Sequence, residues 1–230
     1  RAGVDPELIW EAWPWAFLGG CVGARLYYLL AVGDAPPLWA LSSWSGMNML
    51  RGTSIQGAML GAFLSFTLFM RRRKLPVLPL LDAFAPGAPL MHAITRLGCF
   101  FAGCCWGRPT ALPWGVVFTH PLASAPRGMA LHPAQLYEAG LDLVLSWHLH
   151  RRLAAGGRPP GDAFWRYLGG YGAIRFAVQF LRDDDAGHLV LGLAHSQYLA
   201  LAMLALALWM LRRQFLADST NDCRGTSSTG

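Results

Sequence analysis

The sequence predicts an all-α integral membrane protein, a polytopic helical bundle with six transmembrane helices and a small outer-face loop or head. Three observations support this fold class. Of the 230 residues, 54% are hydrophobic and only 14% are charged, against roughly 45–50% and about 25% in an average soluble domain. The apolar residues form runs long enough to cross a bilayer, which takes about 20 residues. The basic residues lie in short clusters beside these runs.

Six apolar runs qualify as spanning helices by length and composition. The second run is shorter than the others, but it can lengthen upstream. In chain order, the expected helices cover residues 12–32, 55–70, 78–103, 134–150, 163–181 and 190–211.

Three basic clusters orient these helices, because cytoplasmic loops carry an excess of Lys and Arg. The clusters lie at residues 71–74, 151–152 and 212–213. With all three in the cytoplasm, helices two, four and six run inward, and the C-terminus is cytoplasmic. The net charge of +6 then reflects membrane flanks, and no nucleic acid is expected as a partner. Because the chain begins with Arg1 and not methionine, a further helix ahead of it stays open.

The helical part is expected to form one transmembrane domain, residues 1–216. Within it, residues 104–133 are rich in proline, glycine and aromatic residues and are expected to form an ordered loop or head at the outer face. The polar tail, residues 217–230, is predicted to be disordered. Glycines spaced four apart, at Gly19 and Gly23 and at 57 and 61, predict helices that approach closely.

Several charged residues fall inside the predicted spans, where a charge costs roughly 2.5–3.5 kcal/mol and needs a partner or a wet cavity. Arginines outnumber the carboxylates there, which indicates an anionic ligand. These residues are Arg25, Asp82, Arg96, Arg175 and Arg182.

Arg175 and Arg182 are seven residues apart and share a helix face with Gln179. This stripe suits a lipid phosphate held by bidentate hydrogen bonds. Two alternatives stay open at this point: Arg182 snorkels to the interface beside the acidic residues 183–185, and Arg25 pairs with helix carbonyls.

A possible acid–base group opens the fourth predicted helix. His132, Tyr137 and Glu138 lie in the stretch "HPAQLYEAGLDL", and a histidine, a phenol and a carboxylate together can move protons where lipid headgroups lie. The alternative is a helix start whose polar residues face water.

Three of the five cysteines lie within seven residues, at Cys99, Cys104 and Cys105, which does not resemble the spaced pattern of a disulfide scaffold. On a straight helix neither Cys99–Cys104 nor Cys99–Cys105 stacks, although the glycines can end the helix near Gly103. The cluster suggests a thiol site, since an adjacent arginine favours the thiolate. No metal site is expected, because adjacent cysteines rarely ligate one ion together and no histidine pair has ligand spacing.

Five motifs in order resemble the prolipoprotein diacylglyceryl transferase family, from about Gly19 to Leu211. They are "GARLYYLL", "SIQGAMLG", "TRLGCFFAGCCWGRPTALPWGVVF", "HPAQLYE" and "GYGAIRFAVQFLR". The resemblance implies a seven-helix, multi-pass enzyme of the bacterial inner membrane that needs no metal or soluble cofactor. Such an enzyme transfers diacylglyceryl from phosphatidylglycerol to the lipobox cysteine thiol of a prolipoprotein, releasing glycerol phosphate. The implied partners are therefore the membrane, phosphatidylglycerol or another anionic phospholipid, and a prolipoprotein signal peptide.

The resemblance also implies roles for individual residues, with the arginines holding the phosphate and offsetting the charge on the departing glycerol phosphate. The implied catalytic residues are Arg96, Arg175, Tyr137 and Glu138. The implied substrate-binding residues are Arg25, Gln56, Gly107, Arg108, His132, Gln179 and Arg182.

The chain departs from the family pattern where protons would be exchanged. Cys99, Ala102 and Cys104 replace the two asparagines and the glutamate of the family signature. Gln56 replaces the family histidine, and Gln179 replaces a later glutamate. Three hypotheses follow: a divergent transferase of a phospholipid-derived group, a thiol-dependent membrane enzyme, or a non-catalytic relative that binds lipid or a partner.

Overall fold

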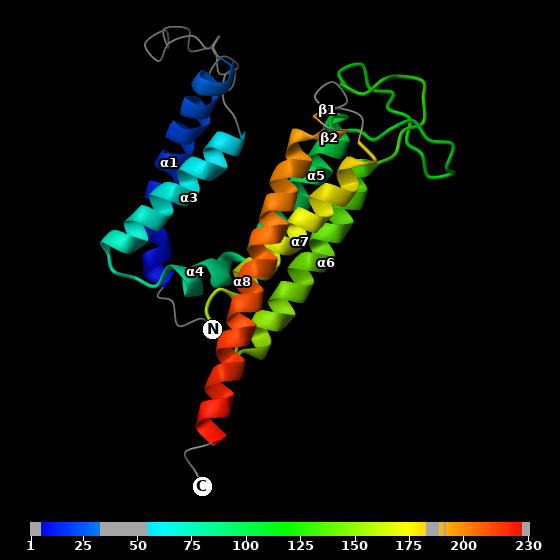
Figure 1. The fold of residues 1–230 in the computed structure, drawn as a ribbon. Helices are drawn as coiled ribbons and strands as arrows, with labels where there is room; N and C mark the ends of the chain where they lie inside the picture. The colour runs from blue at the N-terminus through cyan, green and yellow to red at the C-terminus, as the bar shows by residue number, and fades with distance from the viewer. Residues whose placement is uncertain (1–5, 33–54, 183–188, 191, 227–230) are drawn as a thin grey trace, which may run out of the picture. The chain divides into compact units, whose positions relative to one another are not determined.

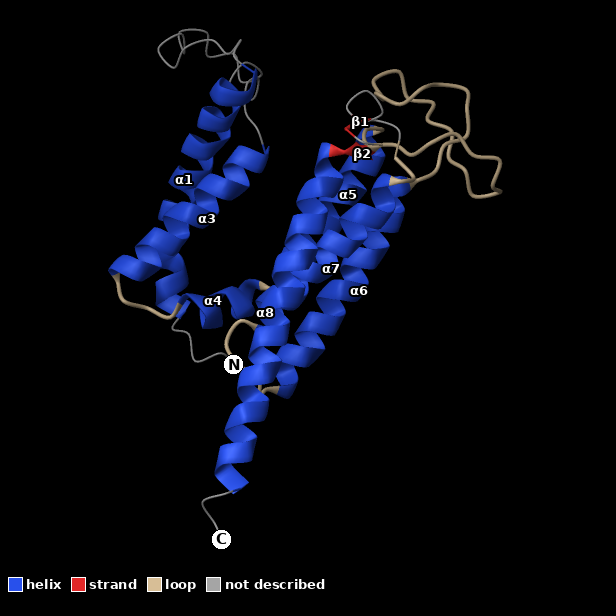
Figure 2. Ribbon diagram, viewed as in Figure 1, coloured by secondary structure: helices blue, strands red, loops and turns tan. Residues whose placement is uncertain are grey.

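The computed structural model describes residues 6–32, 55–182, 189–190 and 192–226. The chain divides into two compact units, residues 1–80 and 81–230, and each is described by itself. Apart from one short β-hairpin, the regular elements of the described residues are helices (Figure 2). The predicted all-α class is therefore confirmed.

The first unit is a pair of helices, α1 (Pro6–Val32) and α3 (Ile55–Arg72), that run in opposite directions (Figure 1). Their backbones touch at glycines. A Cβ added to Gly61 would lie 2.8 Å from the Cα of Gly23, and one added to Gly23 would lie 2.7 Å from the Cα of Gly61. No side chain fits at this crossing, so the close approach predicted from the glycine spacing is confirmed.

Four long helices form most of the second unit. Helix α6 packs against α5 and α7, and α8 packs along α7. Small residues again permit close contact, since a Cβ on Gly172 of α7 would lie 2.8 Å from the carbonyl oxygen of Ala200 on α8. The helices are α5 (Gly87–Ala102), α6 (Ala134–Ala155), α7 (Asp162–Gln179) and α8 (His195–Thr226).

Two predicted helices differ from the observed ones. The run 78–103 is divided into α4 (Val77–Phe84) and α5 near Pro86, because proline lacks the amide hydrogen that a continuous helix needs. The run 190–211 begins as a hairpin of β1 (Leu189–Val190) and β2 (Leu193–Ala194), with Gly192 at φ +81° in the turn.

Helix α8 continues to Thr226, into the predicted tail, because neither proline nor glycine interrupts the sequence between His195 and Arg224. Of the tail, residues 227–230 lie outside the described part of the chain. The disorder of residues 217–230 stays a prediction.

Asp82, one of the charges predicted inside a span, has a structural role. Its carboxylate accepts hydrogen bonds from the backbone amides of Gly161, at 2.5 Å, and Phe164, at 2.8 Å. These amides belong to the first turn of α7 and its approach, where backbone donors lack partners within the helix. Asp82 therefore anchors the start of α7 through hydrogen bonds and through its negative charge.

The non-helical segment 104–133 ties three helix ends together. The Gly107 amide donates to the His132 carbonyl at 3.0 Å, and the Arg108 amide donates to the Leu181 carbonyl at 2.8 Å. Val116 and the buried Leu131 exchange two backbone hydrogen bonds, at 2.9 and 3.0 Å. The end of α5, the start of α6 and the end of α7 are thereby brought to one place, as an ordered segment requires.

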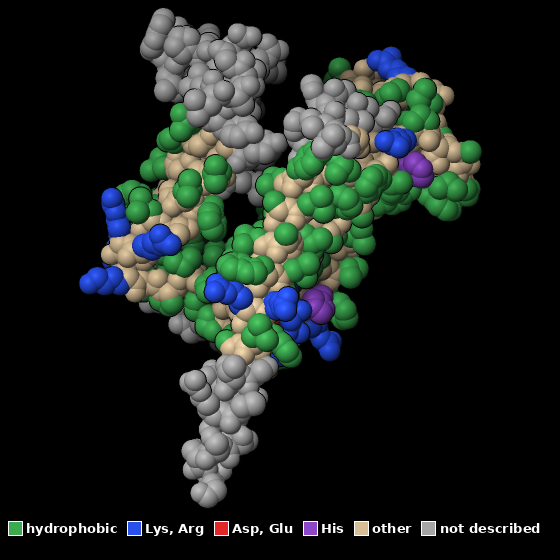
Figure 3. Space-filling view, in the orientation of Figure 1, with side chains coloured by type: hydrophobic (Ala, Val, Ile, Leu, Met, Phe, Trp, Pro, Cys, Tyr) green, Lys and Arg blue, Asp and Glu red, His purple; other side chains and the backbone are tan. Residues whose placement is uncertain are grey.

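The surface of the second unit is that of a membrane protein. Large apolar side chains are widely exposed on its helices, and Figure 3 shows Lys and Arg toward the two ends of this unit with hydrophobic side chains between them. Two segments, Val77–Ala102 and Ser196–Ala217, are long and apolar enough to cross a bilayer by themselves. The membrane class is therefore supported, while six crossings stay a prediction.

Candidate functional site

A buried carboxylate in the first turns of α6 organises the site. Glu138 is only 1% exposed. Arg96 of α5 holds it by a hydrogen bond from Nη2 to Oε1 at 3.0 Å and by an ion pair between Nε and Oε2 at 2.8 Å. These two contacts fix the plane of the guanidinium as well as its position.

Two further arginines approach the same carboxylate. Nη1 of Arg175 and Nη1 of Arg182 each lie 3.7 Å from Oε2 of Glu138. The Arg182 side chain is only 5% exposed, so the alternative in which it snorkels to the interface is wrong. Residues 183–185, the acidic neighbours in that alternative, lie outside the described residues.

The arginine site, defined here as Arg96, Arg175 and Arg182 around Glu138, brings three guanidinium groups to one carboxylate among the residues that the structure describes. Asp142, one turn further along α6, is fully buried as well. Buried cations of this kind are stabilised by an anion, and an anion site at these arginines stays a prediction.

The three predicted acid–base residues divide into two groups. The hydroxyl of Tyr137 accepts a hydrogen bond from Trp114 Nε1 at 2.8 Å and lies 3.3 Å from Nδ1 of His132. The carboxylate of Glu138 is directed instead to the arginines. The two sets of contacts differ because successive helical residues point about 100° apart, and joint acid–base work by the three residues stays a prediction.

Gly107 is required by packing. A Cβ at this position would lie 2.6 Å from the Cβ of His132 and 2.7 Å from the carbonyl oxygen of Leu181. The backbone of Gly107 is thus enclosed by the start of α6 and the end of α7. The neighbouring Arg108 has an exposed side chain and contributes backbone hydrogen bonds, so a direct substrate contact from it stays a prediction.

Gln179, predicted on the arginine stripe, is buried at the end of α7. Its Oε1 accepts a hydrogen bond from Ser196 Oγ at 3.1 Å, which ties the end of α7 to the first turn of α8. Arg25 and Gln56 belong to the other unit, on α1 and α3. Their predicted contribution to substrate binding therefore stays a prediction.

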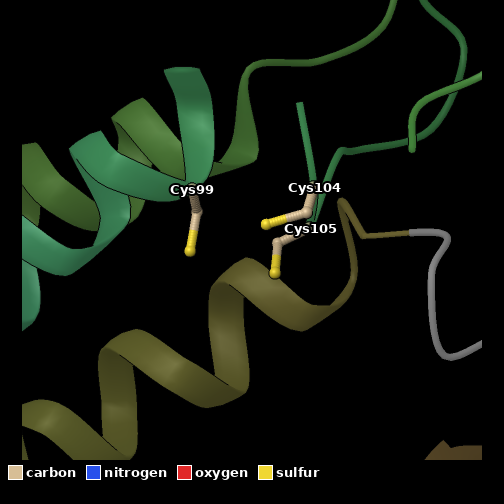
Figure 4. A group of neighbouring side chains, drawn as sticks. All are labelled: Cys99, Cys104 and Cys105. Carbon is tan, nitrogen blue, oxygen red and sulfur yellow. The ribbon is translucent and has the colours of Figure 1, made fainter. Parts of the chain in front are cut away.

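The three sulfur atoms of Cys99, Cys104 and Cys105 lie within 4.8 Å of one another. Gly103 adopts the left-handed conformation at φ 64° and ends α5, and the Cys104 amide then bonds back to the Cys99 carbonyl at 3.1 Å. The helix end expected near Gly103 is therefore confirmed. The argument against a metal site from the adjacency of two cysteines does not hold, because this turn brings all three side chains together (Figure 4).

The thiol cluster borders the arginine site. Cys105 interacts electrostatically with Arg96, which lies one turn before Cys99 on α5. Burial raises the pKa of the Cys104 thiol to about 12, helped by Cys105 and Cys99. Cys104 is therefore a neutral thiol at neutral pH when it binds nothing.

Sequence reasoning missed two kinds of residue. Gln135 is 1% exposed and donates from Nε2 to the Cys104 carbonyl at 2.6 Å, so it secures the cysteine turn; its place in "HPAQLYE" was the available signal. His92 stacks on Tyr171 at 4.4 Å and contacts the Tyr167 hydroxyl at 3.2 Å. Nothing in their spacing along the chain connects these three rings before the helices pack.

Comparison with known proteins places these contacts in a family context. A family model described as "Prolipoprotein diacylglyceryl transferase" matches residues 1–213. The chain is 37% identical to the phosphatidylglycerol–prolipoprotein diacylglyceryl transferase of Bordetella parapertussis over 188 residues, 81% of this chain and 68% of the relative. Similar proteins of the same name occur in Rhizobium meliloti, 35% identical over 92% of this chain and 74% of the relative, and Clostridium tetani, 32% identical over 91% and 82%. Helices α5, α6 and α7 lie wholly within the matched stretch.

Proposed function

The chain belongs to the prolipoprotein diacylglyceryl transferase family, and we propose that it transfers diacylglyceryl from phosphatidylglycerol to the lipobox cysteine thiol of a prolipoprotein. The observation that carries this proposal is the arginine site. Three cationic side chains from two helices and the segment after α7 surround one buried carboxylate. Phosphatidylglycerol supplies an anionic phosphate for such a site.

The geometry suits a phosphate. Glu138 orients Arg96 through one hydrogen bond and one ion pair. Arg175 and Arg182, at 3.7 Å, are held to Glu138 by electrostatic attraction, since this distance exceeds that of a hydrogen bond. A phosphate can therefore approach both guanidinium groups without breaking a hydrogen bond to Glu138.

The same charges promote the reaction. The acceptor sulfur attacks the glyceryl carbon that bears the phosphate ester, the C–S bond forms, and the C–O bond breaks. The electron pair of that bond leaves with the glycerol phosphate, where negative charge develops. Arginines already oriented in a dry site stabilise this charge without reorganising. The His132–Tyr137 pair, in the first turn of α6 and just before it, is then placed near the acceptor.

The membrane arrangement is part of the proposal. All six predicted segments contain helices, and we infer that they cross the bacterial inner membrane as one domain, residues 1–216, with segment 104–133 outside and the C-terminus in the cytoplasm. Reporter fusions after residue 216 and within segment 104–133 test this arrangement. An external C-terminal reporter contradicts it.

The activity is tested with the full chain in lipid nanodiscs containing radiolabelled phosphatidylglycerol. A lipobox peptide with its cysteine should become labelled, and the same peptide with serine should not. Absence of labelled peptide and of any other acylglyceryl product contradicts the proposal.

A second candidate, a lipid-binding relative without catalysis, is favoured by one observation. Cys99 stands where the family usually has an asparagine, and Cys104 and Gln179 stand where it usually has glutamates. The same nanodiscs separate the two candidates. Thermal stabilisation by phosphatidylglycerol without any turnover supports the second candidate, and turnover excludes it.

A further inference from the structure

The thiol cluster, Cys99 with Cys104 and Cys105, is a converging set of ligand atoms. One sulfur comes from the last turn of α5 and two come from the turn that follows (Figure 4). The three side chains point into one space beside α7, and their sulfur atoms all lie within 4.8 Å of one another. All three residues are half-buried, so an ion or a thiol can reach the cluster from outside.

The backbone holds this arrangement at three points. Gly103 is left-handed at φ 64° and Cys105 at φ 61°, a conformation that residues other than glycine rarely adopt. Between them, the Cys104 carbonyl is held by the buried amide of Gln135 at 2.6 Å. An unusual conformation supported by a buried hydrogen bond is typical of a functional turn and not of a free loop.

Three thiolates select a soft metal ion and not a hard one such as magnesium or calcium. Zinc binds thiolate sulfur at about 2.3 Å in tetrahedral geometry, which places two ligand sulfurs about 3.8 Å apart. The sulfur atoms lie within 4.8 Å of one another, so small side-chain rotations bring them to this separation. Three protein ligands leave the fourth tetrahedral position open, as in catalytic zinc sites.

The charge of the neighbourhood favours such a complex. A zinc ion with three thiolates carries one net negative charge, and the arginine site beside it brings together three guanidinium groups. Cys105 already interacts electrostatically with Arg96. The two sites therefore stabilise each other when the metal is bound.

We propose that Cys99, Cys104 and Cys105 bind one zinc ion, whose fourth position takes the acceptor cysteine of the transfer reaction; the second part rests on the proposed function. The chemistry explains how the chain works with Cys104 in place of a glutamate. Zinc deprotonates a coordinated thiol outright, so the proton passes to solvent and no carboxylate base is needed.

The acceptor thiol loses its proton to water on binding zinc, and the zinc-bound thiolate donates an electron pair to the glyceryl carbon. The C–O bond to phosphate breaks, and its electron pair leaves with the glycerol phosphate toward Arg96 and Arg175. The product thioether is neutral and a weaker zinc ligand than a thiolate, so it departs and the next acceptor binds.

The first test of the metal site measures metal binding and does not use the transfer reaction. Full-length protein, purified in chelated buffer and titrated with zinc, should bind one ion per chain by elemental analysis. The variants Cys99→Ser and Cys104→Ser/Cys105→Ser should lose that ion, and Cys21→Ser, an exposed cysteine on α1, should retain it. Cadmium should give a sulfur-to-metal ultraviolet band in the wild-type and Cys21→Ser proteins only. Equal zinc binding by the wild type and a folded triple-serine variant, judged by its elution and melting, overturns the proposal.

The open position is tested with cobalt in place of zinc. Adding the lipobox peptide should increase the thiolate-to-cobalt absorbance, and the serine peptide should not. An absorbance that does not change when the cysteine peptide is added overturns the assignment of the fourth ligand. The same assignment is overturned if the cluster binds monovalent copper in a three-coordinate complex and binds no other metal ion.

Activity then separates this inference from the proposed function. Chelation should abolish transfer and zinc should restore it, with phosphatidylglycerol binding unchanged. Transfer at the wild-type rate by the triple-serine variant overturns the metal proposal and leaves the proposed function standing. One bound zinc that accepts the peptide thiol, without any transfer, supports the metal site and contradicts the proposed function.

Discussion

Two buried carboxylates of the second unit, Glu138 and Asp162, are both paired with arginines but serve different purposes. Asp162 lies at the start of α7 and forms hydrogen bonds with Arg152, at 2.7 and 3.3 Å, and Arg166, at 3.0 Å. Each of its arginines makes a hydrogen bond to it. Glu138 has three arginines, of which two stand at 3.7 Å. The 3.7 Å separation of Arg175 and Arg182 from Glu138 distinguishes this group from the hydrogen-bonded arginines of Asp162.

The largest effect on the transfer rate is expected from removing an arginine that contacts Glu138. Arg96→Ala should lower the transfer rate by about 10²–10³-fold, because it removes a donor aimed at developing charge. The labelled-peptide assay measures this loss. Arg152→Ala is the matched control, an arginine on a buried carboxylate outside the arginine site, and it should retain transfer. Equal losses in the two variants would contradict the distinction.

Neutralising Glu138 removes the carboxylate that Arg96, Arg175 and Arg182 share. Glu138→Gln should destabilise the protein by about 3 kcal/mol, since an uncompensated buried charge costs this much. Phosphatidylglycerol should recover part of the loss, because a ligand that binds only the folded state stabilises it. Thermal melting in detergent with and without this lipid measures both effects. A neutral lipid such as phosphatidylcholine serves as the control, and equal recovery by it would argue against an anion site.

Asp162 should show the pH dependence of a structural pair. Burial raises the pKa of this carboxyl, but hydrogen bonds from Arg152 and Arg166 outweigh burial and hold the pKa below its ordinary value of 3.8. The stability it contributes is therefore present above pH 3.8 and is lost as pH falls through the lowered folded value. Asp162→Asn should cost about 1–2 kcal/mol at neutral pH and progressively less in acid. If the stability difference between the wild type and Asp162→Asn stays constant from pH 7 to about pH 2, this expectation is contradicted.

The smallest expected effect concerns the rim of the site. Trp114→Phe removes the hydrogen bond from Nε1 to the Tyr137 hydroxyl and should cost about 0.5–1 kcal/mol at most, because this contact is solvent-exposed. Transfer should fall only a few-fold. Tyr137→Phe, which removes the same bond and the contact to His132, should have the larger effect. The reverse order would show that Trp114 itself touches the substrate.

Much of this fold followed from local patterns. The apolar runs located the helices, Pro86 and Gly103 lie where α5 begins and ends, and the start of α6 at Ala134 was expected within one helix turn. The hairpin before α8 was missed because its two-residue strands are too short to show a period. The family motifs predicted that Arg96 and Arg175 belong to one site, and both side chains lie at Glu138.

The sequence by itself determined where the helices lie, where α5 ends, and which arginines are carried into apolar surroundings, because these depend on hydrophobicity, proline and glycine over a few residues. Only the tertiary structure decided that arginines 42 and 37 residues from Glu138 share its carboxylate, that the Tyr137 hydroxyl contacts the His132 ring, and that three sulfurs meet. Helical periodicity orders residues within one element. Contacts between elements depend on how α5, α6 and α7 pack, and on a left-handed turn after α5 that returns two cysteines to a third.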